Sequence, residues 1–582
     1  MLKTILGSVR EYKRPTYATI FLGGIEALFE IVLPIWMAGL IDKGIEAGNM
    51  RQVWLYVGLL LLFAGLQVVT GVAASYKGAA ASAGFAANLR HDMFENVQTY
   101  SFANIDKFST ASIVTRLTTD VTNIRNSYNM MIRMAVRAPM MMIFAIVASF
   151  SIDRDISMTF LAVTPFLAIG LGLIIYFAYP IFNEVFANYD KLNNVVQENV
   201  RGVRVVKSFN QEDHEIRKFN VVSALIRKLY VKVECIIAMN GPIMQVSMYA
   251  AMMLISWFGA KAIVASGNNV ANGLTTGALT ALFTYSMQIL MSMMMLSMVF
   301  VMILIASASA RRIAEVLTEE ATIHNPENPV DTVRDGEIRF EHVDFDYKRD
   351  GAGKVLDDVN LVMPSGATVG ILGATGSAKS SLVQLIPRLY DVTAGRVLVG
   401  GVDVRDYDLD ALRGAVSMVL QKNELFGGTI ADNLRWGNEN ATDEDIRHVC
   451  HLACADEFIE QMPDGYDTHI DQGGSNVSGG QKQRLCIARA LLKKPKILIL
   501  DDSTSAVDTR TDAIIQAGLR DYIPETTKII IAQRVSSLAH ADMIVVLDEG
   551  RVVATGSHDE LLAHCDIYRD VYDSQQKGAL KE

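Results

Sequence analysis

Cysteine is scarce in this chain: five are present among 582 residues, at Cys235, Cys450, Cys454, Cys486 and Cys565. Small secreted proteins that depend on disulfides are far richer in cysteine. Cys450-His451-x-x-Cys454 resembles half of a zinc site, but no second ligand pair follows it. We therefore interpret the cysteines as incidental thiols in a reducing compartment.

Positive charge is also in short supply. Lys and Arg total 53 against 63 Asp and Glu, so the net charge is −10, and no basic tail or arm is present. Nucleic-acid-binding domains concentrate positive charge on one face, so we expect no nucleic-acid partner. A cleavable signal peptide is not expected either, because the first apolar stretch, 16–41, is too long for the core of one. We expect that stretch to stay in the protein as a membrane anchor.

Apolar residues, by contrast, make up 51% of the chain and are concentrated in its first 310 positions. A helix that spans a bilayer needs ~20 predominantly apolar residues in succession. Six runs reach this length: 16–41, 53–76, 127–151, 157–182, 236–265 and 275–305. We predict a polytopic α-helical membrane domain with six transmembrane helices.

The distribution of Lys and Arg between the loops predicts the topology. The segment between spans four and five, about 184–235, carries nine of them, whereas the loop at 265–273 carries none. Because cytoplasmic loops are enriched in these residues, we place the N-terminus, both long loops and the C-terminal half in the cytoplasm. The long loops, about 77–126 and 184–235, are predicted to be helical, with chain reversals near 110–116 and 208–216. We expect these reversals to contact a cytoplasmic domain.

The sequence pattern changes at about residue 336. Short β-branched runs alternate there with helical stretches, which is typical of a parallel α/β domain. We divide the chain into a membrane domain (1–319), a polar linker (320–335) and an α/β domain (336–582).

A phosphate-binding loop is nearly complete in the α/β domain. The segment Gly373-Ala374-Thr375-Gly376-Ser377-Ala378-Lys379-Ser380 follows an apolar run and opens a helical one, the order in which backbone N–H groups cradle phosphate. The pattern G-x-x-x-x-G-K-[ST] is met except that Ala378 replaces the second glycine. We expect alanine to be tolerated because of a negative φ at this helix entry. The expected nucleotide contacts are Gly373, Thr375, Gly376, Ser377, Ala378, Lys379, Ser380 and Ser381.

Two carboxylates follow a second apolar run. Ile497-Leu498-Ile499-Leu500 leads into Asp501, which together with the Ser380 hydroxyl offers the oxygen ligands that Mg²⁺ prefers. The next residue, where a Glu is expected as general base, is Asp502. The sequence therefore predicts a P-loop nucleotide-binding domain that takes ATP and Mg²⁺.

A second motif, Val477-Ser478-Gly479-Gly480-Gln481-Lys482-Gln483-Arg484, precedes an apolar helix. With the phosphate loop it resembles the ATP-binding cassette, and 198–209 is similar to the fourth-to-fifth-helix loop of ABC exporters. The resemblance implies that Tyr347 stacks on adenine, that Gln421 senses Mg²⁺ and contacts the membrane domain, and that Asp508 belongs to the D-loop. In this family two cassettes enclose two ATP molecules, which implies contacts with the ATP of a partner subunit for Ser478, Gly479, Gly480 and Gln481.

Two positions depart from the family pattern. Asp502 replaces a catalytic Glu and is one methylene shorter, and a misplacement of ~1 Å can cost ~10²-fold in rate. Gln533 replaces a switch His, and an amide neither carries charge nor shuttles a proton. The chain therefore resembles the degenerate-site subunit of heterodimeric bacterial multidrug-type ABC exporters.

This resemblance implies an exporter subunit in the bacterial plasma membrane that moves amphipathic or hydrophobic, drug- or lipid-like compounds outward by alternating access. Its signature motif is expected to complete the catalytic site of a second, homologous half-transporter, where most hydrolysis would occur. Two alternatives remain open: a regulatory ATP-binding subunit that gates a partner, and an active homodimeric exporter. A soluble ABC ATPase is excluded by the six spans.

Four charged residues lie deep within the predicted spans. Glu26 and Glu30 are one turn apart in span one, and Arg133 and Arg137 are one turn apart in span three. At 1.5 Å per residue, Glu26 and Arg137 lie roughly 25 Å from the outer end. Charges at this depth are costly and are usually paired or face a cavity. We hypothesise a cavity in which Glu26 and Glu30 bind cationic substrates; pairing between helices alone is the alternative.

Methionines crowd spans three and six, and Met291 and Met295 of span six are examples. Flexible thioethers suit the binding of varied apolar ligands, so these two residues are candidates for the substrate path. Packing against lipid or against other helices is the alternative.

Overall fold

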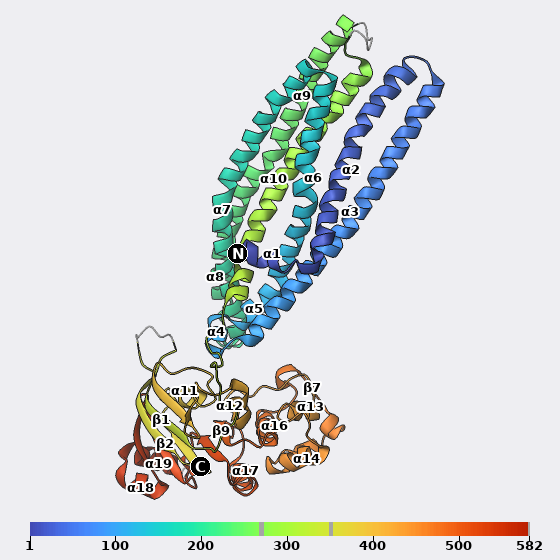
Figure 1. Ribbon diagram of the computed structural model, residues 1–582. Helices are drawn as coiled ribbons and strands as arrows, with labels where there is room; N and C mark the ends of the chain where they lie inside the picture. Colours follow the sequence, from blue (N-terminus) through green and yellow to red (C-terminus); the bar gives the residue numbers. More distant parts are fainter. Residues whose placement is uncertain (267–272, 348–352, 580–582) are drawn as a thin grey trace. The chain divides into compact units, whose positions relative to one another are not determined.

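The computed structural model describes residues 1–266, 273–347 and 353–579. By their internal contacts these residues form two compact units (Figure 1). The first contains Met1–Gln98 and Thr110–Glu319, and the second contains Thr99–Ser109 and Glu320–Glu582. Each unit has a hydrophobic core of its own.

The first unit is built of helices. Among the described residues, six helical stretches are long and apolar enough to cross a membrane, which confirms the predicted number of spans: Arg10–Ile45, Met50–Thr99, Thr110–Ile152, Arg154–Phe182, Glu212–Ala265 and Thr276–Thr318. The elements are α1 (Leu2–Gly7), η1 (Arg10–Tyr12), α2 (Lys13–Gly39), η2 (Leu40–Ile45), α3 (Met50–Thr99), α5 (Thr110–Thr115), η3 (Arg116–Asp120), α6 (Val121–Ile152), α7 (Arg154–Ser208), α8 (Glu212–Ala238), α9 (Asn240–Ser266) and α10 (Thr276–Thr318). Of these, η2 and η3 are π-helical turns.

The start of α10 is held by a carboxylate from η2. Asp42 Oδ2 accepts a hydrogen bond from Thr275 Oγ1 over 2.6 Å, and Asp42 Oδ1 accepts one from the Gly277 N–H over 2.8 Å. A carboxylate at this position satisfies helix N–H groups that have no intrahelical partner and is favoured by the helix dipole. A Cβ on Gly277 would lie 2.4 Å from the Ala38 carbonyl oxygen of α2 and 2.7 Å from Asp42 Cγ of η2, so the close approach of these two elements to α10 requires glycine.

One of the two predicted chain reversals is in place and the other is wrong. Residues 209–211 separate α7 from α8, as predicted. The first reversal does not lie near 110–116, because α5 and η3 continue into α6 as one helical stretch. The chain turns instead around the short helix α4 (Phe102–Lys107), which Ser101 and Asn104 begin with a reciprocal capping box.

The second unit is an α/β domain, as predicted. Its main sheet has six strands in the order β12-β11-β3-β10-β9-β6, beside a four-stranded sheet, β2-β1-β4-β5, and a two-stranded one, β7-β8. The strands are β1 (Ile338–Phe345), β2 (Leu356–Met363), β3 (Thr368–Leu372), β4 (Ala394–Val399), β5 (Val402–Asp403), β6 (Val416–Val419), β7 (Gly428–Thr429), β8 (His469–Ile470), β9 (Ile497–Asp501), β10 (Thr527–Ile531), β11 (Met543–Asp548) and β12 (Arg551–Gly556). The helices are α11 (Lys379–Gln384), α12 (Leu409–Ala415), α13 (Ile430–Arg435), α14 (Asp443–Leu452), α15 (Asp456–Ile459), α16 (Gly479–Leu492), α17 (Thr509–Tyr522), α18 (His558–His564) and α19 (Asp566–Ala579).

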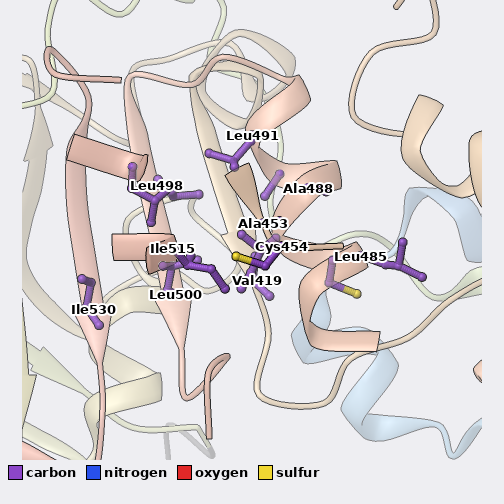
Figure 2. Close-up of a cluster of buried hydrophobic side chains, with 14 of the residues drawn as sticks. Val419, Ala453, Cys454, Leu485, Ala488, Leu491, Leu498, Leu500, Ile515 and Ile530 are labelled. Carbon is purple, nitrogen blue, oxygen red and sulfur yellow. The ribbon is translucent and has the colours of Figure 1, made fainter. Parts of the chain in front are cut away.

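Strands β3, β9 and β10 are parallel and completely buried, which explains their unbroken apolar sequences. Figure 2 shows side chains of β6, β9 and β10 meeting those of α16 and α17 in one cluster. Cys450 and Cys454 are buried in it, and burial raises the pKa of the Cys450 thiol to about 12. The His451 ring is exposed and contacts Asp456 over 2.6 Å, so these residues do not converge on a metal.

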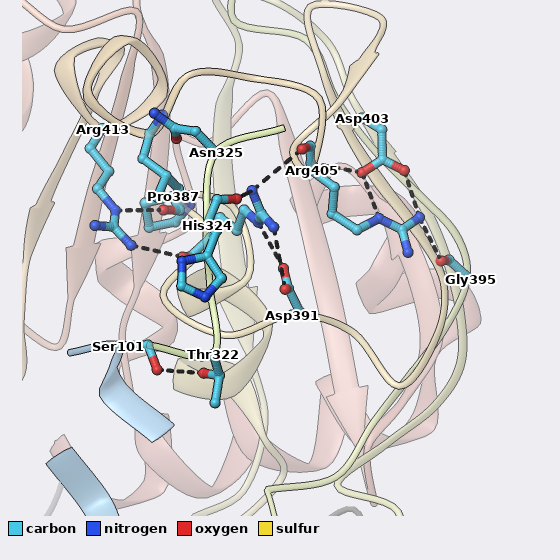
Figure 3. Close-up of polar contacts among 12 residues, drawn as sticks. Ser101, Thr322, His324, Asn325, Pro387, Asp391, Gly395, Asp403, Arg405 and Arg413 are labelled. Atoms are coloured by element: carbon cyan, nitrogen blue, oxygen red, sulfur yellow. Dashed lines mark hydrogen bonds and ion pairs between the residues drawn. The ribbon is translucent and has the colours of Figure 1, made fainter. Parts of the chain in front are cut away.

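Polar contacts hold the segment Thr99–Ser109 and the start of the linker to the second unit (Figure 3). The Ser101 and Thr322 hydroxyl oxygens lie 2.6 Å apart. Arg388, which is 6% exposed, donates from Nη1 to the His324 carbonyl and from Nε to Asp391. A buried guanidinium needs several acceptors, and here they come from the linker and from its own loop.

Candidate nucleotide-binding site

The loop between β3 and α11 has the backbone that the phosphate-binding pattern predicts. A Cβ on Gly373 would lie 2.3 Å from the Leu547 carbonyl oxygen, so only glycine fits there. Gly376 has a φ of +88°, in the region that side chains rarely adopt. The Lys379 ammonium donates to the carbonyl oxygens of Gly373 and Ala374, each over 2.8 Å. The loop therefore wraps around its lysine.

The backbone of Ala378 contradicts the sequence-based expectation. Its φ is +71° and its ψ is 19°, which is left-handed, whereas we expected a negative φ. The left-handed conformation costs an L-residue roughly 1–2 kcal/mol because Cβ approaches the following carbonyl oxygen. Ala378 also packs against the second apolar cluster of the unit, so its methyl group recovers part of that cost.

The expected magnesium ligands meet at the end of β9. Burial raises the pKa of the Asp501 carboxyl, and the nearby Ser380 hydroxyl opposes this with a smaller effect. Burial likewise lowers the pKa of Lys379, against the opposing influence of Asp501 and Asp502. A hydroxyl and a carboxylate in contact, beside a lysine and a glycine loop, form a donor set that fits MgATP.

The two residues that depart from the family pattern contact each other directly. Gln533 Nε2 donates to Asp502 Oδ2 over 3.1 Å, since β9 and β10 are parallel neighbours and Asp501 is level with Ile531. The backbone N–H of Asp502 donates to Ile531 O over 3.0 Å, and Asp502 has a φ of +50°. The carboxylate at the base position is thus held by an amide donor.

Tyr347 and Gln421 come from different strands, since Tyr347 follows β1 and Gln421 follows β6. The Tyr347 hydroxyl is 2.9 Å from Ser381 Oγ on α11, and its ring, 45% exposed, meets Tyr390 edge-on with 5.1 Å between centroids. An exposed ring face beside the phosphate loop suits adenine stacking. Gln421 follows β6, in which Val419 is level with Leu500 of β9, so it shares the sheet edge at which Asp501 lies.

The signature motif begins α16. Ser478 Oγ accepts from the Gln481 N–H over 3.3 Å, and Gln481 Oε1 accepts from the Ser478 N–H over 2.9 Å, a capping box that leaves Gly479 at the first helical position. Asp508 caps α17 by accepting from the Thr511 N–H over 2.9 Å.

Sequence reasoning missed Gln483, which ties the signature helix to the D-loop. This residue is 5% exposed, and its Oε1 accepts from the Ala506 N–H over 3.0 Å while Nε2 donates to Ser505 Oγ over 3.3 Å. A buried side chain with both ends bonded fixes the spacing of the two segments. A glutamine on the buried face of a predicted helix was the available signal.

The sequence matches known family profiles and relatives. A profile described as the ABC transporter transmembrane region matches residues 17–293, and one described as ABC transporter matches 356–505. A Mycobacterium tuberculosis protein (strain ATCC 25618 / H37Rv), named an uncharacterized ABC transporter ATP-binding protein, is 36% identical over 587 residues, covering 100% of this chain and 99% of the relative. The chain belongs to the ABC transporter family. It is an exporter-type half-transporter, with fused membrane and ATP-binding domains, of a family whose ATPases couple hydrolysis to transport.

A further relative and one solved structure are also similar to this chain. YgaD of Bacillus subtilis (strain 168), whose name refers to multidrug export and an ATP-binding/permease protein, is 29% identical and covers 99% of this chain and 99% of its own. The solved structure of a bacterial Atm1-family ABC exporter with ATP bound has a TM-score of 0.80 at 23% identity, covering 97% of this chain and 98% of that one. The latter likeness establishes the fold alone.

In the membrane unit of this ABC exporter, Arg137 lies against both glutamates of α2. Its Nη2 is 2.6 Å from Glu30 Oε2 and 3.4 Å from Glu26 Oε1. The neighbouring Arg133 makes no ion pair with the described residues; its Cδ lies 3.3 Å from the Cβ position of Gly78 on α3. Two carboxylates therefore share one guanidinium.

The two candidate methionines lie on α10 with different exposure. Met291 is 49% exposed, and Met295 is half-buried. Their positions on α10 are compatible with a substrate path and with packing against lipid.

Proposed function

We propose that this chain is the hydrolysis-impaired subunit of a heterodimeric exporter in a bacterial plasma membrane. It moves amphipathic or hydrophobic compounds outward, with its N-terminus and cassette cytoplasmic, a membrane domain at 1–319, a linker at 320–335 and a cassette at 336–582. The observation that carries the proposal is the hydrogen bond from Gln533 to Asp502. Both positions that the chemistry depends on are altered, and the altered residues are bonded to each other.

The chemistry of this pair explains the impairment. A general base must reach the proton it abstracts, and Asp502 is one methylene shorter than Glu. Its Oδ2 already accepts a hydrogen bond from the Gln533 amide, so this oxygen is engaged by an amide donor instead of an attacking water. Gln533 has no group that titrates near neutral pH. The loss of a general base typically costs ~10²–10⁴-fold in rate.

Nucleotide binding does not depend on this pair. Lys379 places a positive charge beside the phosphates, and the Gly373–Ser380 backbone supplies N–H donors. Ser380, Asp501 and Gln421 would hold Mg²⁺, which supplies charge neutralisation at the phosphates. We expect this chain to retain ATP and to favour contact between the cassettes, which changes populations more than rates.

We expect the signature motif of this chain to act at the ATP of the partner subunit. Ser478, Gly479 and Gly480 begin a long helix and offer N–H donors to the ATP of a homologous half-transporter, in which we expect a Glu base and a switch His. Gly479 has room within its own chain, because its Cβ would lie 3.8 Å from Ala506 Cβ. A side chain at Gly479 therefore obstructs the face that the partner uses and leaves the fold of this chain intact.

The test is asymmetric mutagenesis in the heterodimer, reconstituted after the partner is identified by co-purification. We expect Asp502→Ala to keep most of the ATPase activity and Gly479→Leu to abolish most of it, with Gly479→Ala as a matched control that stays close to wild type. Gly480 is unsuitable, since its Cβ would lie 2.8 Å from Ala506 O. An Asp502→Ala loss as large as that from the partner's Glu→Gln, or an active homodimer, contradicts the proposal.

For the substrate we propose cationic amphipathic compounds. Glu26 and Glu30 share the single guanidinium of Arg137, so one negative charge of this trio is left for a cation. Glu26→Gln removes that charge and keeps the shorter pair, and it should reduce transport of cations while leaving neutral substrates unaffected. Glu26→Gln combined with Glu30→Gln should also destabilise the protein by leaving Arg137 unpaired. Unchanged cation transport and unchanged stability in both variants would contradict this assignment.

A further inference from the structure

The C-terminal helix α19 bonds to the segment that carries Gln533. Gln575 Nε2 donates to the Gln533 carbonyl oxygen over 2.8 Å, and Gln575 Oε1 accepts from the Val535 N–H over 2.9 Å. One side-chain amide thus bonds the backbone at two positions that flank Arg534. The two bonds together fix the path of the chain where it leaves β10.

Helix α19 is itself firmly anchored, so this amide has a fixed base. Tyr568 is fully buried, and its hydroxyl lies 2.6 Å from His558 Nδ1. Val571 and Tyr572 pack against the main apolar cluster. Positions 568, 572 and 575 recur with the spacing of one helix face, so Gln575, itself exposed, extends from the same face of α19 as the buried Tyr568.

We infer that Gln575 is a positioning residue of the nucleotide site, acting through Gln533. The Gln533 side chain reaches Asp502 Oδ2, and the direction in which it points depends on the backbone that Gln575 holds. Two bonds to one rigid amide reduce the freedom of this segment before nucleotide binds, which is preorganisation. The inference holds whichever cassette site hydrolyses ATP, because it concerns geometry within this chain.

Hydrogen exchange of the full-length chain tests the bond between the Val535 amide and Gln575. We expect Gln575→Ala to speed exchange of the Val535 amide roughly tenfold, as the loss of one hydrogen bond implies. Gln575→Glu keeps an acceptor for Val535 and loses the donor to Gln533, so exchange at Val535 should stay slow. The matched control is Gln576→Ala at the next residue, which is exposed like Gln575; this substitution should leave exchange at Val535 unchanged.

Unchanged exchange at Val535 in Gln575→Ala would overturn the inference. Protection of the α19 amides in all three variants shows that the helix remains folded, so that local unfolding is not mistaken for loss of the bond.

Release of a fluorescent ATP analogue from the full-length chain separates positioning from a structural role. We expect Gln575→Ala and Gln575→Glu to release it roughly threefold to tenfold faster, and Gln576→Ala to leave the rate unchanged. If Gln575 acts through Gln533, then Gln575→Ala adds nothing in a Gln533→Ala background. Unchanged release in Gln575→Ala, or additive effects in the double variant, would refute a positioning role.

Discussion

Ala378→Gly should stabilise the cassette, against the usual effect of adding a glycine. The left-handed φ of +71° at Ala378 costs an alanine roughly 1–2 kcal/mol. Glycine removes this cost but gains about 0.4–1 kcal/mol of entropy in the unfolded chain. The difference between these two costs lies between about 0 and 1.6 kcal/mol, and loss of the methyl contact with the second apolar cluster reduces it. We therefore expect a net stabilisation of up to about 1 kcal/mol, or a rise of about 2 °C in melting temperature for a domain of this size.

The chain contains matched controls for this prediction. Gly376 has a φ of +88°, and its Cβ would meet nothing within 4 Å, so Gly376→Ala isolates the same conformational cost with the opposite sign. Ala374 lies in the same loop and is not among the residues with positive φ, so Ala374→Gly should destabilise.

The assay follows thermal unfolding of the nucleotide-free, full-length chain by the fluorescence of Trp436. This residue stacks on Phe426 with 4.1 Å between ring centroids. The other three of the 4 tryptophans are replaced by phenylalanine in every variant. A lower melting temperature for Ala378→Gly, or equal shifts for Ala378→Gly and Ala374→Gly, would refute the reasoning.

Two further predictions concern buried carboxylates. Arg312→Ala should destabilise the membrane unit by about 3 kcal/mol, because Asp120, 1% exposed, loses the guanidinium that donates to both of its oxygens. In denaturant unfolding, adding Asp120→Asn should restore much of the lost stability. If stability is not restored, an unpaired charge is not the cause. Burial raises the pKa of Asp501, so folding favours its protonated form and the carboxylate costs stability at pH values above its folded pKa. Asp501→Asn should therefore raise the melting temperature of the nucleotide-free protein at neutral pH, and this stabilisation should disappear as the pH falls below the ordinary pKa of Asp. The same substitution should abolish Mg²⁺-dependent ATP binding. A lower melting temperature at neutral pH would contradict this prediction.

The sequence was most informative where physical constraints are strong. A bilayer needs long apolar runs, and all six predicted spans correspond to helices. Parallel strands buried on both faces need unbroken apolar sequences, and β3 and β9 could be located from them. The phosphate loop was readable because its chemistry fixes residue types at fixed spacing.

Features that depend on tertiary contacts were not predicted. The sign of φ at Ala378 depends on the path of the loop, which local sequence does not determine. Gln575 is 42 residues from Gln533, and nothing in a helical pattern indicates which distant backbone an amide will bond. The misplaced reversal had a readable signal: Ser101 and Asn104 have the spacing of a capping box, but the absence of Pro or Gly there concealed the break.

The segment Thr99–Ser109 affects how this transporter can be recombined with relatives. Its flanking helices, α3 and α5, belong to the first unit, yet its contacts place it in the second. A chimera joined at Glu319 alone would separate Asn104 from the Glu320 carbonyl that it bonds over 2.9 Å in its native cassette. Exchange of cassettes between half-transporters therefore has to carry two pieces of chain, and this short insert is the piece that a cut chosen from the linear sequence would leave behind.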